Sequence, residues 1–119
     1  MAKILLVEDD ASLRKLLKRA MQKAGHEVES ADSGLSALPL LDADAFDLLL
    51  TDIVMPGMDG IELARLASQK APEMRIMFIT GFAAVALNPQ NGVPSRTRVL
   101  SKPFHLRDLV QEIDKVLAA

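Results

Sequence analysis

The sequence of 119 residues contains no cysteine, tryptophan or tyrosine. Without cysteine the chain cannot form disulfides or thiolate metal sites, which is typical of a reducing compartment. An excess of positive charge is also missing, because the net charge is -2, so a general attraction to nucleic acid or anionic membranes is not expected. No apolar run reaches the length of a membrane span or of a signal-peptide core. We therefore expect a cytoplasmic protein of a single domain, without membrane insertion.

What the sequence does contain is a regular alternation of short apolar runs with segments of helical periodicity. Strands are predicted at 3–7, 28–31, 46–51, 75–80 and 99–101, and helices at 13–24, 33–41, 59–70 and 105–117. In the first of these helices Leu13, Leu16 and Leu17 are expected to face the core. The alternation predicts an α/β fold, in which a parallel sheet is covered by helices on both faces.

Two of the predicted helices are interrupted by proline. The helix at 33–41 contains Pro39, so it either starts late, with Ser36 as its cap, or is kinked. A further helix begins near Gly81 but meets Pro89 and Pro94, which predicts that this fourth helix is short or broken.

Polar residues follow four of the five predicted strands. They are Glu8, Asp9 and Asp10 after the first strand, Asp52 at the end of the third, Thr80 at the end of the fourth, and Ser101 and Lys102 after the fifth. A single carboxylate in such a place most often caps the next helix, and we assign Asp10 to that role. Ligands of an open parallel sheet bind beyond the carboxyl ends of its strands, so the whole set indicates a binding site there.

Three carboxylates at one sheet edge repel one another unless a cation neutralises them. Magnesium is suited to this place, because it prefers oxygen ligands and is usually bound through one or two carboxylates together with phosphate. A lysine and a hydroxyl group nearby would bind the remaining oxygens of a phosphoryl group.

These residues resemble those of the receiver domain of response regulators, the phospho-accepting half of two-component signalling. The resemblance covers the whole chain and rests on ILLVEDD, LLLTDIVMPGMDG, FIT and LSKPF in this order. It implies that residues 1–119 form a single receiver domain with no output domain. It also implies a flavodoxin-like, doubly wound sheet of five parallel strands in the order 2-1-3-4-5, with five helices.

The resemblance assigns a role to each residue of the predicted site. Asp52 is the phospho-acceptor, and the magnesium ligands are Glu8, Asp9, Asp52 and the backbone carbonyl of Val54. The residues that bind the phosphoryl group or switch with it are Thr80, Gly81 and Lys102, and the peptide bond before Pro103 is expected to be cis. One departure is Val99, which stands where many receivers have a switching tyrosine or phenylalanine.

The same resemblance implies two kinds of partner. A histidine kinase or a histidine phosphotransferase is the expected phosphodonor, and it would contact the basic face of Arg14, Lys15 and Lys18 unless that face is simply solvated. The stretch MFITGFAAVALNPQNGVP followed by VLSKPFHLR is similar to single-domain receivers that control regulated proteolysis in the cell cycle through the ClpXP protease. A ClpX-like unfoldase is therefore the expected output partner. The candidate contacts are Met58, Phe82 and His105, and Ala118 and Ala119 form a degron-like tail or a frayed helix end.

Two other functions remain as alternatives. The chain could be an enzyme related to phosphatases that use an aspartyl-phosphate, but these need a second acid at the position of Val54, so we expect no enzyme activity beyond self-phosphorylation and self-dephosphorylation. It could also be a degenerate receiver that acts as a constitutive protein-binding adaptor, although the intact set of acidic residues, threonine and lysine argues against this.

Overall fold

The computed structural model describes residues 2–81 and 97–118 of the chain. Strands and helices alternate along it, as the apolar pattern predicts. The elements are β1 (Lys3–Val7), α1 (Ala11–Lys23), β2 (Glu27–Ala31), α2 (Gly34–Ala43), β3 (Leu48–Asp52), α3 (Gly60–Lys70), β4 (Arg75–Thr80), β5 (Thr97–Ser101) and α5 (Leu106–Ala118).

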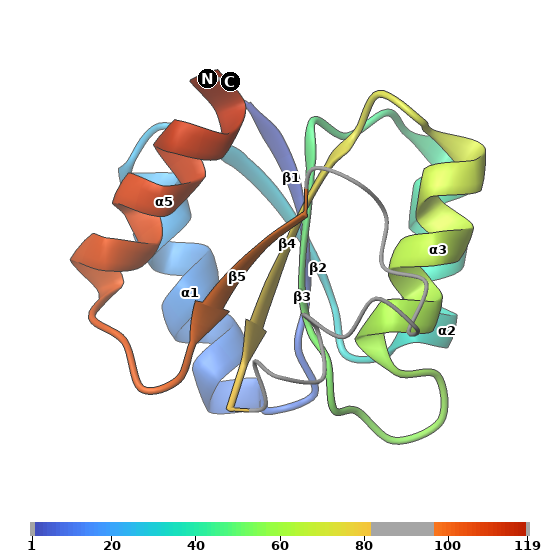
Figure 1. The fold of residues 1–119 in the computed structure, drawn as a ribbon, viewed down its shortest axis with the longest axis horizontal. Coiled ribbons are helices and arrows are strands. Elements are labelled where there is room, and N and C mark those ends of the chain that lie inside the picture. Colours follow the sequence, from blue (N-terminus) through green and yellow to red (C-terminus); the bar gives the residue numbers. More distant parts are fainter. Residues whose placement is uncertain (1, 82–96, 119) are drawn as a thin grey trace.

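The strands form one parallel sheet in the order β2-β1-β3-β4-β5, which confirms the predicted flavodoxin-like topology. Figure 1 shows this sheet nearly edge-on, with α1 and α5 on one face and α2 and α3 on the other. The central position of β3 explains why LLLTD is buried at every residue, since a central parallel strand is covered on both sides.

Each face of the sheet has its own apolar core, because alternate side chains of a strand point to opposite faces. In β1, Leu5 and Val7 belong to the cluster under α2 and α3, whereas Ile4 and Leu6 belong to the cluster under α1 and α5. The same alternation continues in β3 and β4. The two cores hold the strands in register, and the register fixes which residues reach the sheet edge.

Short polar side chains begin three of the helices. The Asp10 side chain accepts from the N–H of Leu13, which confirms its role as the cap of α1. The Asp59 side chain caps α3 in the same way through Glu62. Ser33 and Ser36 form a capping box at α2, and each of these bonds satisfies an N–H that has no partner within its helix.

The helix α2 differs from one prediction about Pro39. It does not start late with Ser36 as its cap, because Ser33 is the cap and Ser36 occupies the third helical position. The helix runs on to Ala43 with Pro39 inside it. The strong cap and the packing of Leu38, Leu40 and Leu41 against the core offset the hydrogen bond that proline cannot donate.

Other element boundaries differ from the predicted ones by one or two residues, and the prediction of one core residue is wrong. Strand β3 starts at Leu48 rather than at Phe46 and ends on Asp52 itself, and β5 starts at Thr97. Leu16 is not in the core, since it is 49% exposed, whereas Leu17 is fully buried. The predicted fourth helix lies outside the described residues.

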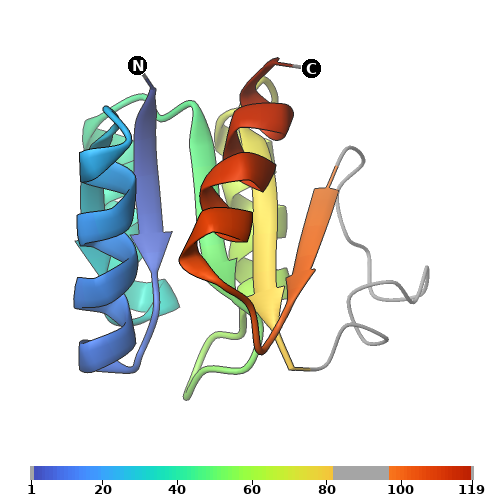
Figure 2. The same ribbon diagram turned by 90° about the vertical axis from the view of Figure 1, so that its left-hand side faces the viewer.

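The carboxyl ends of all strands lie at one edge of the sheet, and the described ends of the chain lie at the opposite edge (Figure 2). The loops that follow β1, β3 and β5 therefore meet at a single edge and build the site there.

Within residues 2–81 and 97–118, no helix is long and apolar enough to cross a membrane.

Candidate functional site

The centre of the site is a cluster of three carboxylates on two neighbouring strands. Glu8 and Asp9 follow β1, Asp52 ends β3, and these strands are hydrogen-bonded neighbours. One carboxylate oxygen from each residue lies within 4.8 Å of the other two. Glu8 is 1% exposed and Asp52 is 6% exposed, whereas Asp9 is exposed. The predicted acidic residues are therefore brought together in the structure.

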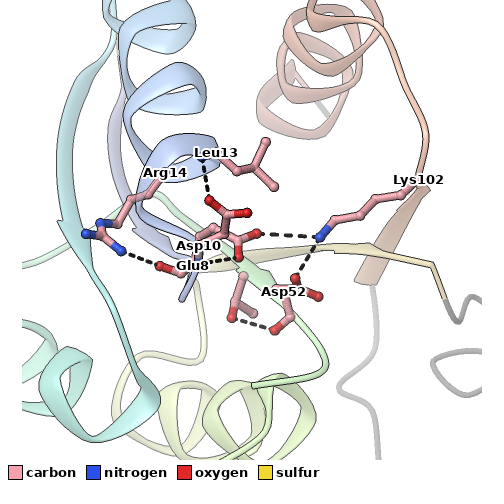
Figure 3. Close-up of polar contacts among 7 residues, drawn as sticks. Glu8, Asp10, Leu13, Arg14, Asp52 and Lys102 are labelled. Carbon is pink, nitrogen blue, oxygen red and sulfur yellow. Dashed lines mark hydrogen bonds and ion pairs between the residues drawn. The ribbon is translucent and has the colours of Figure 1, made fainter. Parts of the chain in front are cut away.

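Lys102 is the cation that reaches this cluster. Its Nζ lies 2.8 Å from Oδ2 of Asp52 and 3.6 Å from Oε1 of Glu8, as Figure 3 shows. Burial alone would lower the pKa of Lys102, but the hydrogen bond and charge of Asp52, together with Glu8, raise it above its usual value. Lys102 is thus held in its charged form against the carboxylate of Asp52.

One ammonium group does not balance the buried carboxylates. Burial raises the pKa of Glu8 to about 7, and Asp9 and the charge of Asp52 act in the same direction. The N–H of Asp10 and the charge of Lys102 oppose this shift. Among the described residues, Oε1 of Glu8 is buried without a hydrogen-bond partner. A clustered, oxygen-only donor set with an unsatisfied buried oxygen fits a hard divalent cation such as Mg²⁺.

The loop from Glu8 to Asp10 is held by one internal hydrogen bond and by two from Arg14. The N–H of Asp10 donates to Oε2 of Glu8 at 3.1 Å, and the N–H of Arg14 donates to the carbonyl of Asp10 at 2.8 Å. The guanidinium of Arg14 donates to the carbonyl of Glu8 at 2.8 Å. No sequence pattern predicts this last bond, because the spacing of Arg14, Lys15 and Lys18 indicates an exposed basic face.

The backbone of Asp52 is held from two sides. The hydroxyl of Thr51 donates to the carbonyl of Asp52 at 2.8 Å. A Cβ added at Gly60 would lie 2.0 Å from this same carbonyl oxygen, so only glycine allows the start of α3 to approach it. The N–H of Gly60 also donates to the carbonyl of Ile53 at 2.8 Å. The sequence shows a glycine at position 60, but no sequence pattern reveals that it packs against the carbonyl of Asp52.

The predicted switch residues lie at the end of β4, beside β3. Thr80 is fully buried, and its carbonyl accepts the N–H of Lys102 at 2.8 Å, which links β4 to the chain that follows β5. Gly81 is exposed and has open space around it. The bond between Lys102 and Pro103 is cis, as expected.

The other predicted residues lie around this centre. Val54 is 57% exposed, and Lys15, His105 and Ala118 are exposed. Lys18 is half-buried on α1, and Met58 is half-buried against the core beneath α2 and α3. Phe82 and Ala119 lie outside the described residues.

Residues 4–114 match the family model of the response regulator receiver domain, and the chain belongs to this family. It is the receiver domain of a two-component response regulator. The chain is 60% identical over 119 residues to the response regulator receiver protein CpdR of Brucella abortus (strain 2308), covering 100% of this chain and 99% of that one. This finding confirms the resemblance to single-domain receivers.

Solved structures give the same result. A response regulator receiver protein from Sinorhizobium medicae WSM419 is 34% identical, with a TM-score of 0.88 over 98% of this chain and 94% of that chain. The response regulator TrrA from Thermotoga maritima, solved in complex with Mg²⁺-BeF, is 28% identical, with a TM-score of 0.86 over 98% of this chain and 99% of that chain. Receivers of this family accept a phosphoryl group from histidine kinases and bind Mg²⁺ in their acidic pocket.

The contact of Gly60 with Asp52 generates a prediction on stability. We expect Gly60→Ala to lower the free energy of unfolding by ~3 kcal/mol, because the new methyl group must displace the Asp52 peptide or the start of α3. The measurement is urea denaturation followed by circular dichroism. Gly81→Ala is the control, since a Cβ there meets nothing within 4 Å. Equal stability of the two variants would contradict the prediction.

The raised pKa of Glu8 generates a prediction on pH dependence. Because the folded pKa is about 7 and the ordinary value is 4.5, the folded state binds this proton more tightly, and stability is lost as pH rises from about 4.5 to 7. We expect Glu8→Gln to remove this loss, so that its advantage over the wild type grows by roughly 1 to 3 kcal/mol between pH 4.5 and 8. Urea denaturation in EDTA measures it.

The matched control for this experiment is Glu29→Gln, which removes the same charge from an exposed position of β2. Its stability difference from the wild type should change little over this pH range. A pH profile of Glu8→Gln that runs parallel to that of the wild type would show that Glu8 does not carry the effect.

Proposed function

We propose that the chain is a phosphorelay response regulator that accepts a phosphoryl group on Asp52 and thereby changes its binding to a partner protein. The observation that carries this proposal is the position of Asp52. Its carboxylate is almost buried at the carboxyl edge of the sheet, clusters with Glu8 and Asp9, and lies 2.8 Å from Lys102. A carboxylate that only ended a strand would not need this surrounding set of charges.

The residues present support a magnesium site next to the acceptor. Glu8, Asp9, Asp52 and the backbone carbonyl of Val54 are the proposed ligands. The first three are the clustered oxygen donors, and the unsatisfied Oε1 of Glu8 fits a cation there. When bound, Mg²⁺ neutralises the carboxylates and the charge on the phosphoryl oxygens.

The acceptor carboxylate acts as a nucleophile in this proposal. A carboxylate oxygen of Asp52 forms a bond to phosphorus while the bond between phosphorus and the donor histidine nitrogen breaks, and the released imidazole keeps its electron pair. Lys102 exchanges part of its contact with Asp52 for a phosphoryl oxygen. Because the phosphoryl group is transferred to a residue of the chain itself, we propose no enzyme activity toward a separate substrate.

The new charge supplies the switch. Phosphorylation replaces the single negative charge of Asp52 by roughly -1.5 to -2 beside Thr80, whose neighbour Ile79 pairs with Asp52 in the sheet. The Thr80 hydroxyl can bond a phosphoryl oxygen, and Gly81 offers the backbone freedom to follow it. This is a local charge change that shifts a two-state element of the backbone.

The proposed docking surface for the histidine kinase or phosphotransferase is the outer face of α1. Leu16 is 49% exposed there, with the exposed Lys15 beside it and Lys18 further along the helix. An exposed leucine flanked by lysines suits a partner helix that has both apolar and acidic residues.

For the output we propose control of regulated proteolysis through a ClpX-like unfoldase. The support is the resemblance of MFITGFAAVALNPQNGVP and VLSKPFHLR to receivers with this role, together with full-length similarity to a single-domain receiver. Met58, Phe82 and His105 are the proposed contacts, and the tail at Ala118 and Ala119 is a proposed degron. The alternative is a constitutive adaptor that binds its partner without regard to Asp52.

The phosphorylation proposal predicts a magnesium-dependent modification at one residue. Incubation with acetyl phosphate should produce a shifted band on a phosphate-affinity gel with Mg²⁺ and none with EDTA, and Asp52→Ala should abolish it. Lys102→Met should reduce the shift at least tenfold, since it removes the cation that contacts the acceptor. A shift that persists in Asp52→Ala, or that is absent from wild type even with a cognate phosphotransferase, would refute the proposal.

The output proposal predicts that binding depends on the state of Asp52. The affinity for a purified ClpX unfoldase should differ at least fivefold between the unphosphorylated wild type and the protein after treatment with acetyl phosphate and Mg²⁺. Asp52→Ala should show no such change. Binding that is equal in all samples would favour the constitutive adaptor, and an absence of binding in every sample would exclude the unfoldase as the partner.

A further inference from the structure

Arg14 occupies a place in the structure that differs from that of the other basic residues on α1. It is half-buried, whereas Lys15 and Arg19 are exposed. Its guanidinium turns back toward the carboxyl edge and donates to the carbonyl of Glu8 at 2.8 Å. Figure 3 shows the side chain extending from the start of α1 to the loop that carries the acidic residues. A docking residue on an exposed face has no need of this internal bond.

The carbonyl that Arg14 binds belongs to the peptide group between Glu8 and Asp9. The orientation of this peptide group determines the direction in which both carboxylate side chains leave the backbone. The backbone N–H of Arg14 also donates to the carbonyl of Asp10 at 2.8 Å. One residue therefore holds both ends of the three-residue loop, through its side chain at one end and its main chain at the other.

The bond to Glu8 acts through the peptide and not through an ion pair. In the part of the chain that the structure describes, no ion pair joins the guanidinium of Arg14 to a carboxylate. The acidic side chains are thus left for Lys102 and for a cation, while the backbone beneath them is fixed. A planar guanidinium suits this task, because its donors have a fixed geometry that the ammonium of lysine cannot reproduce.

We propose that Arg14 is a positioning residue for divalent-cation binding. By holding the Glu8–Asp9 peptide, it keeps the carboxylates of Glu8 and Asp9 directed toward that of Asp52. This inference rests on the magnesium site proposed above. Groups that orient metal ligands typically change metal affinity by about 10- to 100-fold when they are removed, so a measurable effect is expected.

The test is Mg²⁺ titration of the full chain by isothermal titration calorimetry at pH 8, where Glu8 is ionised. Wild type, Arg14→Gln, Arg14→Lys and Arg19→Gln are compared. The matched control is Arg19→Gln, which removes the same charge from an exposed position on the same helix. We expect Arg14→Gln to weaken Mg²⁺ binding about 10-fold and Arg19→Gln to weaken it less than about twofold, by loss of a distant charge alone.

Arg14→Lys separates geometry from charge. It keeps the positive charge but loses the guanidinium, and we expect it to weaken Mg²⁺ binding nearly as much as Arg14→Gln. A second readout follows the bond itself, because the carbonyl ¹³C shift of Glu8 should move in both Arg14 variants and stay unchanged in Arg19→Gln. Thermal unfolding in EDTA, followed by circular dichroism, shows whether each variant is folded.

Each outcome has a distinct meaning. If wild type does not bind Mg²⁺, the proposed magnesium site fails. If wild type binds Mg²⁺ and Arg14→Gln binds it as tightly as Arg19→Gln does, the positioning role is overturned, even where Arg14→Gln is less stable in EDTA. Should Arg14→Gln not fold, the folded Arg14→Lys variant decides: affinity like that of wild type would overturn the inference.

Discussion

The constraint on which this structure depends is the repulsion among three carboxylates at the carboxyl edge of the sheet. Two of them, on Glu8 and Asp52, are almost fully removed from water, and a buried carboxylate is costly unless it is paired or neutralised. Lys102 supplies one positive charge at 2.8 Å from Asp52. The rest of the fold serves to hold these groups together in spite of their repulsion, because both apolar cores fix the neighbouring strands from which the acids project.

The same constraint explains why the backbone around the acids is so closely held. Gly60 approaches the carbonyl of Asp52 so tightly that a side chain would not fit, and the hydroxyl of Thr51 bonds that carbonyl. In the loop after β1, the guanidinium of Arg14 on α1 donates to the carbonyl of Glu8. In each case a neutral peptide group is held, which leaves the carboxylate oxygens available. The proposed uptake of a phosphoryl group benefits from this arrangement, since the carboxylate of Asp52 stays in place while its charge partners change.

Much of the fold and of the site could be predicted from the sequence, because both follow from local patterns. Strand alternation determines the parallel sheet, and polar residues after apolar runs must meet at its carboxyl edge, which is where Asp52 and Lys102 meet. The failures concern contacts between segments that are distant in sequence or that turn back on themselves. Helical spacing placed Leu16 in the core, but Leu17 and Met21 fill the space under α1 and leave Leu16 exposed. Arg14 looked like part of a basic face, because no sequence pattern reveals a bond to a backbone carbonyl six residues earlier. The sequence also left open a late start of α2 at a Ser36 cap, because Pro39 is disfavoured inside a helix, whereas in the structure Ser33 is the cap and pairs with Ser36 in a capping box.

The charge balance of the site finally connects its resting state to its function. Among the described residues, three carboxylates face one ammonium group and lack two positive charges, which is the charge of one divalent cation. Without a cation the cluster lowers its own repulsion by holding a proton on Glu8, whose pKa is about 7. A proton and the proposed divalent cation would therefore compete for the same oxygens near neutral pH, and binding of one would release the other. In the proposed function, phosphorylation replaces the single charge of Asp52 by a group of roughly -1.5 to -2, so it increases the demand for positive charge at this edge. The proposed phosphorylation would therefore strengthen cation binding at this edge, and by reciprocity a bound cation would favour the phosphorylated state.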